Sequence, residues 1–572
     1  MSFSNATRVK GSPSSGGGFG AARGSGELDS GFGAARGSGE LDYLSNSDDD
    51  HNFTPQTSTI PDIKIEVLVE KKKNLVVFVE SNKDFVDLLF SFLTLSMGTI
   101  VNLLHEKSPP TVIGCMNNLY KSVENLDAQF LNTEACKDML LQLRRLSEFQ
   151  CSNLKQAIVG KLNPSECYYI CGDSNCRKEG KGIVSDFSNV RCHCGEVMDQ
   201  LVTLSEHTTK ASCDEGEGEF LKGGTEKFLV SDDLQIMAGS IPPSMMLLKK
   251  LGIVDANELE SRSLNIGPEE IFQLLRLSLL TKAPLTHWIS LAKGASDPIE
   301  IETRNMAKSL GKRSATSDPK KMSLTIFISK SRNKVLYAEC REDFVDFLFS
   351  FLTFPLGSIV KLLGGKSSLG SFDSLYKNVN DLSTENYLKS EELKNVLLSP
   401  KLAPFFACEN QLLHIEESSS PQYLLYTCGV TDGEWFVHPM TSKFDGPCFG
   451  EKLGLLSMVN PKSSTGETTG GGGFVKGPAK FMVTDDLVVT PLSPISSISF
   501  LGKLDVPITD VDQKVVTVGE EEALHLLKAA LISETALTDV FTSRDQSAED
   551  VKCSFGGTAL MMKALLKSFY LP

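Results

Sequence analysis

The sequence is dominated by one apolar stretch that occurs twice. Residues 84–104 read DFVDLLFSFLTLSMGTIVNLL and residues 343–363 read DFVDFLFSFLTFPLGSIVKLL, with 15 of the 21 positions identical. Self-similarity of this kind indicates an internal duplication, and it bears on the whole fold. The repeat therefore predicts two similar units in tandem, and each part of the chain can be compared with its counterpart in the other unit.

The duplicated stretch is apolar enough to be compared with a membrane span. Two aspartates near its start and Gly98 in its centre argue against a span, and Pro355 interrupts the second copy at the same place. Proline inside a helix removes a hydrogen bond and clashes with the preceding turn. The first copy is therefore predicted to form two short buried helices, over 84–95 and 98–105, with a tight junction between them.

Four polar residues, Asp84, Asp87, Ser91 and Thr94, share one face of the first predicted helix. Two carboxylates could serve acid–base catalysis or bind a cation, above all if the fold brings His287 close. The alternative is a polar stripe whose aspartates complement the positive end of the helix dipole. Because no histidine, cysteine or glycine-rich loop lies beside the pair in sequence, the polar stripe is preferred and no catalytic residue is assigned.

Charge and cysteine content narrow the class of protein. The 572-residue chain carries a formal net charge of −15 and no long Lys/Arg run, whereas proteins that bind nucleic acid usually carry a basic patch. The first residues, MSFSNATRVKGSPSS, lack the apolar core of a secretory signal. We therefore expect a cytoplasmic or nuclear protein, where disulfides rarely persist. The fourteen cysteines are then buried thiols or metal ligands.

Composition divides the chain into five segments. Residues 1–61 are rich in Gly, Ser and Asp and are predicted to be disordered, because so polar a tract buries too little apolar surface to offset its ordering entropy. The first unit follows at 62–293, and a linker broken by prolines at 294–321. The second unit is 322–543, and the tail is 544–572, with an amphipathic helix at 559–570.

Both units show the same order of predicted elements. Each begins with a β-hairpin, whose turns are Lys71–Asn74 and Lys330–Asn333. The fold class is therefore α+β, with two similar tandem domains, each built from a hairpin, a helix cluster, a small cysteine-bearing sheet and closing helices. A strand is expected at KFLVSDD and at KFMVTDD. Further helices are predicted at 116–126, 134–146, 268–281, 372–382, 391–398 and 520–532.

Five cysteines lie close together in the first unit, with His193 between the last two: Cys167, Cys171, Cys176, Cys192 and Cys194. Two thiol pairs about 15 residues apart resemble a zinc ribbon, in which two turns offer four thiolates to a tetrahedral ion. Within the ribbon-like segment 165–200, the candidate ligands of a structural zinc ion are Cys171, Cys176, Cys192 and Cys194.

The spacing of these cysteines also supports an alternative. Ribbons usually show C-x2-C in both arms, whereas this segment reads C-x4-C and C-x-C. Alternate residues of a strand point to opposite faces of a sheet. Several unconnected buried thiols on two paired strands therefore remain an open interpretation.

The second unit lacks most of this cluster. It keeps Cys428 and Cys448, while Gly433 replaces the second cysteine of the first arm. A four-thiolate site cannot form there, so a metal would stabilise the first unit locally. Zinc held by four protein thiolates has no open position for a substrate, which argues against a catalytic role.

With these motifs in order, the chain resembles the plant proteins grouped as domain-of-unknown-function family 674. The resemblance extends over residues 62–543 and rests on DFVDLLFSFLT, LYKSVENL, the CxxxxC…CxCG segment and KFLVSDDL. It implies tandem copies of one unit and a plant source, and it supplies no activity, substrate or catalytic residue. The N-terminal tract and the cysteine-poor second unit depart from the family pattern.

The leading functional hypothesis is a non-catalytic interaction or scaffolding protein with a protein partner and a structural zinc ion. The sequence contains no nucleophile–base motif and no nucleotide-binding loop, and it identifies no small-molecule substrate. One alternative is an enzyme with a site near Asp84 and Asp87. Another is a zinc-ribbon protein that binds nucleic acid through Lys178, Lys181 and Arg191.

Overall fold

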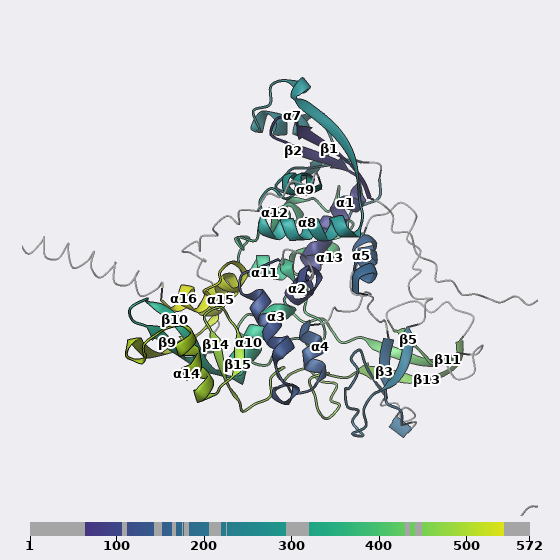
Figure 1. Ribbon diagram of the computed structural model, residues 1–572. Helices are drawn as coiled ribbons and strands as arrows, with labels where there is room; N and C mark the ends of the chain where they lie inside the picture. Colours follow the sequence, from purple (N-terminus) through teal and green to yellow (C-terminus); the bar gives the residue numbers. More distant parts are fainter. Residues whose placement is uncertain are drawn as a thin grey trace, which may run out of the picture. The chain divides into compact units, whose positions relative to one another are not determined.

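The structure of the chain is a computed structural model (Figure 1). It describes residues 63–105, 111–141, 151–162, 167–173, 175–176, 182–204, 219–224, 226–292, 320–428, 435–440 and 449–542. The predicted disordered tract, most of the predicted linker and the predicted C-terminal helix lie outside these described residues.

The first half of the described chain, residues 63–292, mixes strands and helices. Its strands are β1 (Ile63–Glu70), β2 (Leu75–Ser81), β3 (Cys167–Ile170), β4 (Gly182–Ser185), β5 (Gln200–Leu204), β6 (Phe228–Val230), β7 (Ile236–Ala238) and β8 (Leu259–Ile266). Its helices are α1 (Lys83–Ser91), the short η1 (Phe92–Thr94), α2 (Met97–His105), α3 (Met116–Asn125), α4 (Ala135–Leu141), α5 (Ser152–Leu162), α7 (Ile241–Lys250), α8 (Pro268–Leu280) and α9 (Pro284–Ala292).

The second half, residues 320–542, has a similar set of elements. Its strands are β9 (Met322–Ser329), β10 (Lys334–Arg341), β11 (Gln422–Cys428), β12 (Trp435–Pro439), β13 (Phe449–Met458), β14 (Lys480–Thr484), β15 (Val489–Pro491) and β16 (Val511–Val518). Its helices are α10 (Glu342–Thr353), α11 (Leu356–Leu362), α12 (Phe372–Asp381), α13 (Glu391–Leu398), α14 (Pro494–Lys503), α15 (Glu520–Ile532) and α16 (Ala536–Phe541). The α+β class is confirmed.

Both predicted hairpins are present. β1 pairs with β2 and β9 pairs with β10, antiparallel in each case. The turns end on Asn74 and Asn333, whose φ angles are 52° and 46°. Asparagine occupies this left-handed region more readily than most other residues, which is the physical reason that the two turns could be recognised from sequence.

Each hairpin forms the centre of a five-stranded sheet. The first sheet has the order β7-β6-β2-β1-β8, and the second has the order β15-β14-β10-β9-β16. Equivalent strands therefore occupy equivalent places in the two sheets, which have the same topology. The strands predicted at KFLVSDD and KFMVTDD are β6 and β14, and each extends its sheet beside the hairpin.

The duplicated apolar stretch forms two helices in each half, as predicted: α1 with η1 and then α2, and α10 and then α11. The junctions of the two pairs contact each other. The Met97 amide donates to the Phe354 carbonyl at 3.1 Å, and the Leu356 amide donates to the Leu95 carbonyl at 2.9 Å. A β-carbon on Gly98 would lie 2.9 Å from the Leu140 carbonyl oxygen of the same half and 3.0 Å from the Leu352 carbonyl oxygen of the other half. Packing on both sides therefore favours glycine here.

These helices lie in the core. None of the helices in the described part of the chain is long and apolar enough to cross a membrane. One hydrophobic core cluster contains residues from both halves. The phenylalanines of the duplicated stretch are fully buried in it: Phe85, Phe90, Phe92, Phe344, Phe347, Phe349, Phe351 and Phe354.

The cysteine-bearing strands differ from the expectation that each domain has a small sheet of its own. Six strands close into one barrel in the order β11-β12-β5-β3-β4-β13. Figure 1 labels β3, β5, β11 and β13 of this group. β3 pairs with β4 and β5, β11 pairs with β12 and β13, and parallel pairs β4–β13 and β5–β12 join the halves. Each half contributes three strands to the barrel. Closure gives hydrogen-bond partners to the backbone groups of their edge strands, which would otherwise be unpaired.

Two glycine turns also connect the halves. Gly114 and Gly370 have φ angles of 47° and 45°. The residue after each turn donates its amide to the opposite half, Cys115 to the Ala530 carbonyl at 2.8 Å and Ser371 to the Ser278 carbonyl at 2.9 Å.

Substituting one of these glycines should destabilise the whole fold. In Gly370→Ala, the new β-carbon would lie 2.2 Å from the Ser278 carbonyl oxygen in a left-handed backbone. We expect the free energy of unfolding to fall by about 2–4 kcal/mol, measured by urea unfolding followed by circular dichroism.

Gly502→Ala is the matched control. Gly502 lies in α14, and a β-carbon there would meet nothing within 4 Å. This variant should be stabilised by about 0.5–1 kcal/mol, because alanine loses less backbone entropy on folding. Equal stability of the two variants would contradict the role assigned to the glycine turn.

Candidate metal centre

The first two candidate ligands follow the end of β3. Cys171 comes directly after the strand and is buried. The chain then turns at Asp173, whose carboxylate accepts a hydrogen bond from the Asn175 amide at 2.9 Å. The turn places the Cys176 thiol 3.7 Å from the other carboxylate oxygen of Asp173. Both thiols thereby lie at one end of the barrel.

The second pair lies in a tight turn, residues 190–198, which we call the knuckle. The Met198 amide donates to the Val190 carbonyl, the Cys192 amide donates to the Glu196 carbonyl, and Gly195 has a φ angle of 91°. Cys192 and Cys194 are thus in a turn instead of an extended strand. The objection that alternate strand residues point to opposite faces does not apply to them.

The four predicted ligands come together. The sulfur atoms of Cys171, Cys176, Cys192 and Cys194 all lie within 4.8 Å of one another, and those of Cys171 and Cys194 are 3.6 Å apart. A tetrahedral zinc site with Zn–S bonds of about 2.3 Å has sulfur–sulfur separations of about 3.8 Å. The cluster could therefore hold a metal ion with small side-chain adjustments.

The electrostatics of the cluster also suit a cation. Burial, together with the neighbouring thiols, raises the pKa of Cys176 well above its usual range and raises the pKa of Cys192 to about 12. A backbone hydrogen bond from Glu196 lowers the pKa of Cys194. Four thiolates this close repel one another, and a bound divalent ion would offset that repulsion.

Cys167, the fifth cysteine of the segment, is outside this group. It begins β3, where it pairs with Thr203 of β5, and its side chain is half-buried. Of the counterparts in the second half, Cys428 ends β11, while Gly433 and Cys448 lie outside the described residues.

The second half packs against the cluster. Val459 belongs to the small apolar cluster around Cys171 and Cys192, and its amide donates to the Val184 carbonyl at 2.9 Å. Gly466 has a φ angle of 74°, and a β-carbon there would lie 2.4 Å from the backbone nitrogen of His193. These contacts join residues more than 250 positions apart, so no sequence motif predicts them.

The aspartates of the duplicated stretch anchor loops. Asp87 is almost fully buried, and its carboxylate accepts backbone hydrogen bonds from Glu219 at 2.7 Å, Phe220 at 3.1 Å and Leu221 at 3.0 Å. Burial raises its pKa to about 7, although these hydrogen bonds act in the opposite direction. The expectation of a stripe serving only the helix dipole is therefore wrong for Asp87.

The second half repeats this arrangement. The Asp346 carboxylate accepts from the Phe474 and Val475 amides, both at 2.8 Å. Asp84, in contrast, is half-buried and accepts from the Asn82 side-chain amide at 2.8 Å. His287 lies on α9 and bonds to Thr281 and to the Ala283 carbonyl in the turn that precedes this helix. Asp87 and Asp346 thus anchor distant loops, while these hydrogen bonds of Asp84 and His287 are to nearby residues.

The residues proposed for phosphate contacts receive little support. Lys178 and Lys181 lie outside the described residues. The Arg191 guanidinium donates to the Gly195 carbonyl at 2.9 Å and so closes the knuckle.

The family model described as "Protein of unknown function (DUF674)" matches residues 59–521. The chain belongs to the DUF674 family. Neither the curated proteins nor the solved structures contain a match to it. The family membership thus agrees with the motifs in the sequence, and arguments about function rest on the site itself.

The buried aspartate can be tested by Asp87→Asn. Asparagine has one acceptor oxygen instead of two, so at least one backbone N–H loses its partner. We expect the free energy of unfolding to fall by about 1–3 kcal/mol in urea unfolding.

Asp84→Asn provides the comparison, since Asp84 is half-buried and accepts from one neighbouring side chain. We expect this second variant to lose less than about 1 kcal/mol. An Asp87→Asn variant as stable as the parent would rule out the loop-anchoring role.

Proposed function

We propose that this DUF674 protein is a non-catalytic interaction protein of the cytoplasm or nucleus, with one structural zinc ion that stabilises its barrel. The observation that carries the zinc assignment is the group of four cysteine sulfur atoms within 4.8 Å of one another. Tetrahedral four-sulfur sites hold zinc or iron, and zinc is the usual ion in structural sites.

The ligand set supports a structural role. Four thiolates complete the coordination of a tetrahedral ion, so that no position is left for water or substrate. The contacts of Val459 and Gly466 put the second half directly against the knuckle. Metal binding would therefore stabilise the place where strands of both halves close the barrel. Thiolates survive in the reducing compartments that we propose for the protein.

We further propose that the two halves derive from one copied module. The matching strand orders of the two five-stranded sheets support this, as do the paired contacts at the two glycine turns and the two buried aspartates. The domain boundaries 62–293 and 322–543 then describe two copies whose cysteine-bearing strands combine into one barrel.

The interaction role is supported by apolar side chains on corresponding helices. In the first half Ile241 of α7 is 76% exposed, and Val254 after it is 95% exposed. In the second half Ile495 of α14 is 78% exposed and Ile508 is 74% exposed. In each half one of these groups lies on the helix and the other a few residues after it, and exposed apolar groups that form a contiguous patch mark interaction sites. The net charge of −15 disfavours an anionic membrane, so a protein with an apolar face is the proposed partner.

Two corresponding surfaces suit bivalent binding. Once one surface is occupied, the second contact becomes effectively intramolecular and raises the overall affinity if the geometry allows both. This gives a reason for a non-catalytic protein to keep two similar halves.

Metal content tests the zinc proposal. The purified full-length protein should carry about one zinc ion per chain by inductively coupled plasma mass spectrometry, as four thiolates bind one ion. A Cys171→Ser/Cys194→Ser variant should lose it, and removal of the metal should lower the thermal unfolding temperature.

Cys167→Ser is the matched control, because Cys167 lies in the same segment but outside the cluster. It should keep the metal. Equal zinc in the double variant and the parent, or iron in place of zinc, would refute the assignment.

The interaction proposal is tested by charge on the two surfaces. Affinity purification with the parent protein should recover partner proteins. The recovered amount should fall for Met245→Asp on α7 and for Ile498→Asp on α14, because each change places a charge on an exposed apolar side-chain position. The double variant should lose these partners, because bivalent binding loses its avidity. Lys503→Asp, an exposed change on α14 without loss of apolar surface, is the control. A set of partners unchanged in the double variant would contradict the proposed surfaces.

A further inference from the structure

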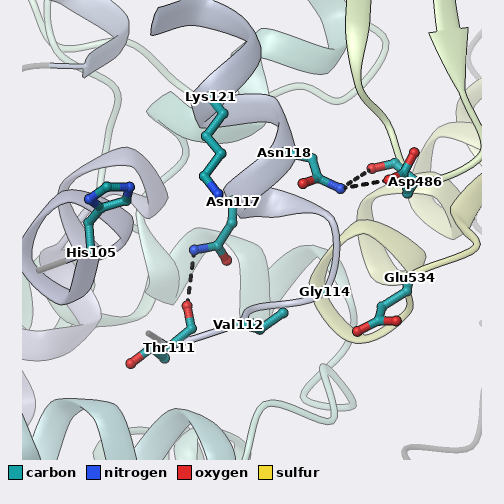
Figure 2. Close-up of a pocket in the computed structure, with 9 residues that line it drawn as sticks. All are labelled: His105, Thr111, Val112, Gly114, Asn117, Asn118, Lys121, Asp486 and Glu534. Atoms are coloured by element: carbon teal, nitrogen blue, oxygen red, sulfur yellow. Dashed lines mark hydrogen bonds between the residues drawn. The ribbon is translucent and has the colours of Figure 1, made fainter. Parts of the chain in front are cut away.

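A cavity separate from the cysteine cluster lies between elements of the two halves (Figure 2). It has a volume of about 290 Å³. The end of α2 and the start of α3 line it from the first half, and the turns that follow β14 and α15 line it from the second half. This size is at the lower end of the range for small-molecule sites.

The charged side chains of the cavity are separated by sign. Lys121 comes from α3, and Asp486 and Glu534 come from the second half, while His105 at the end of α2 adds an imidazole ring to the wall. Figure 2 shows the two acidic side chains together on one side, away from His105. Neither Lys121 nor Glu534 forms an ion pair with another described residue. Opposite charges therefore line the cavity without neutralising each other directly.

The acidic side is partly preorganised. The side-chain amide of Asn118 donates to the Asp486 carbonyl at 2.9 Å and to its carboxylate at 3.1 Å. The Thr484 hydroxyl donates to the other carboxylate oxygen at 2.5 Å. A carboxylate held in place by two neighbours loses less entropy when it binds a cationic group.

A buried hydroxyl in the cavity wall lacks a partner. Thr111 is 2% exposed, and its Oγ1 atom has no hydrogen-bond partner among the described residues. At the corresponding place in the second half, the Ser367 hydroxyl donates to Asp373 at 2.7 Å. In the first half Asn117 replaces that aspartate and bonds to the Thr111 carbonyl instead. The Thr111 hydroxyl oxygen is itself inaccessible, so it is part of the cavity wall and does not serve as a ligand contact.

We infer that this cavity binds a small zwitterion, such as an amino acid or a dipeptide. Its carboxylate would lie toward Lys121 and His105, and its ammonium group toward Asp486 and Glu534. Charge-assisted hydrogen bonds at both ends would orient the molecule. The inference does not depend on the metal centre, since none of the lining residues belongs to the cysteine cluster.

The second half offers a natural comparison for the charge pattern. Lys377 stands where Lys121 stands in the first half, but Lys282 occupies the place that corresponds to Glu534. The corresponding region therefore lacks one of the two acidic groups, and we expect one zwitterion site per chain.

Calorimetric titration of the full-length protein tests the inference. The probes are glycylglycine and alanine, which are zwitterions, N-acetylglycine, which carries only the anion, and glycinamide, which carries only the cation. We expect saturable binding of at least one zwitterion at one site per chain, and much weaker binding of both singly charged probes.

Lys121→Met and Glu534→Gln should each weaken zwitterion binding by about fivefold, the size expected for an ion pair at a partly exposed site. Lys377→Met should leave it unchanged. Tight binding of N-acetylglycine or glycinamide would show a site for a single charge and overturn the inference. Absence of saturable binding for all four probes, or an equal loss in Lys377→Met, would also overturn it.

Discussion

The structure depends on backbone pairing between its two halves. The junctions of the two apolar helix pairs exchange hydrogen bonds between Leu95 and Leu356 and between Met97 and Phe354. The barrel also depends on pairing between the halves. β4 and β5 of the first half pair with β13 and β12 of the second half, respectively. Without those neighbours, each half would leave strand edges and buried backbone groups unpaired. The halves therefore stabilise each other.

Buried polar groups extend this dependence to the loops. Asp87 holds residues 219–221 beside the first helix pair, and Asp346 holds residues 474–475 beside the second. The loop held by Asp87 continues across to the other half, since the Phe220 carbonyl accepts from the Lys389 amide at 2.9 Å. A carboxylate inside the core is expensive unless it is hydrogen-bonded. Its place in both copies of the stretch is explained by the backbone donors that it satisfies.

The candidate metal centre and the zwitterion cavity both lie where the halves meet. The knuckle contacts Gly466 across that boundary, and the cavity combines Lys121 with Glu534. Each site thus takes its surroundings from residues more than 250 positions apart in the chain. Alignment of the two halves pairs equivalent positions, such as Lys121 with Lys377. It does not predict which residues of one half contact different residues of the other half, so neither site could be found in that way.

The local structure was largely predictable. Periodicity and turn residues predicted the hairpins around Asn74 and Asn333, the helix pairs and the closing helices α8 and α15, because these depend on neighbours in sequence. Several elements were not predicted: α5, α7, α9, α14 and α16, and the strands β7, β8, β15 and β16. The sequence of α5, SNLKQAIVGKL, has only a weak apolar stripe. The role of Asp87 was also missed, because its partners are backbone amides some 130 residues away.

The sequence by itself indicated the family, the α+β class, both hairpins, the strands β6 and β14, and four cysteines as candidate ligands. Only the tertiary structure decided that the cysteine-bearing strands of both halves form one barrel, and that Cys192 and Cys194 occupy a turn. The physical reason is that an unpaired strand edge can bond to any compatible strand, and a thiolate can share a metal ion with any nearby thiolate. The local sequence does not fix which one. That choice is made by the packing of residues far apart in the chain.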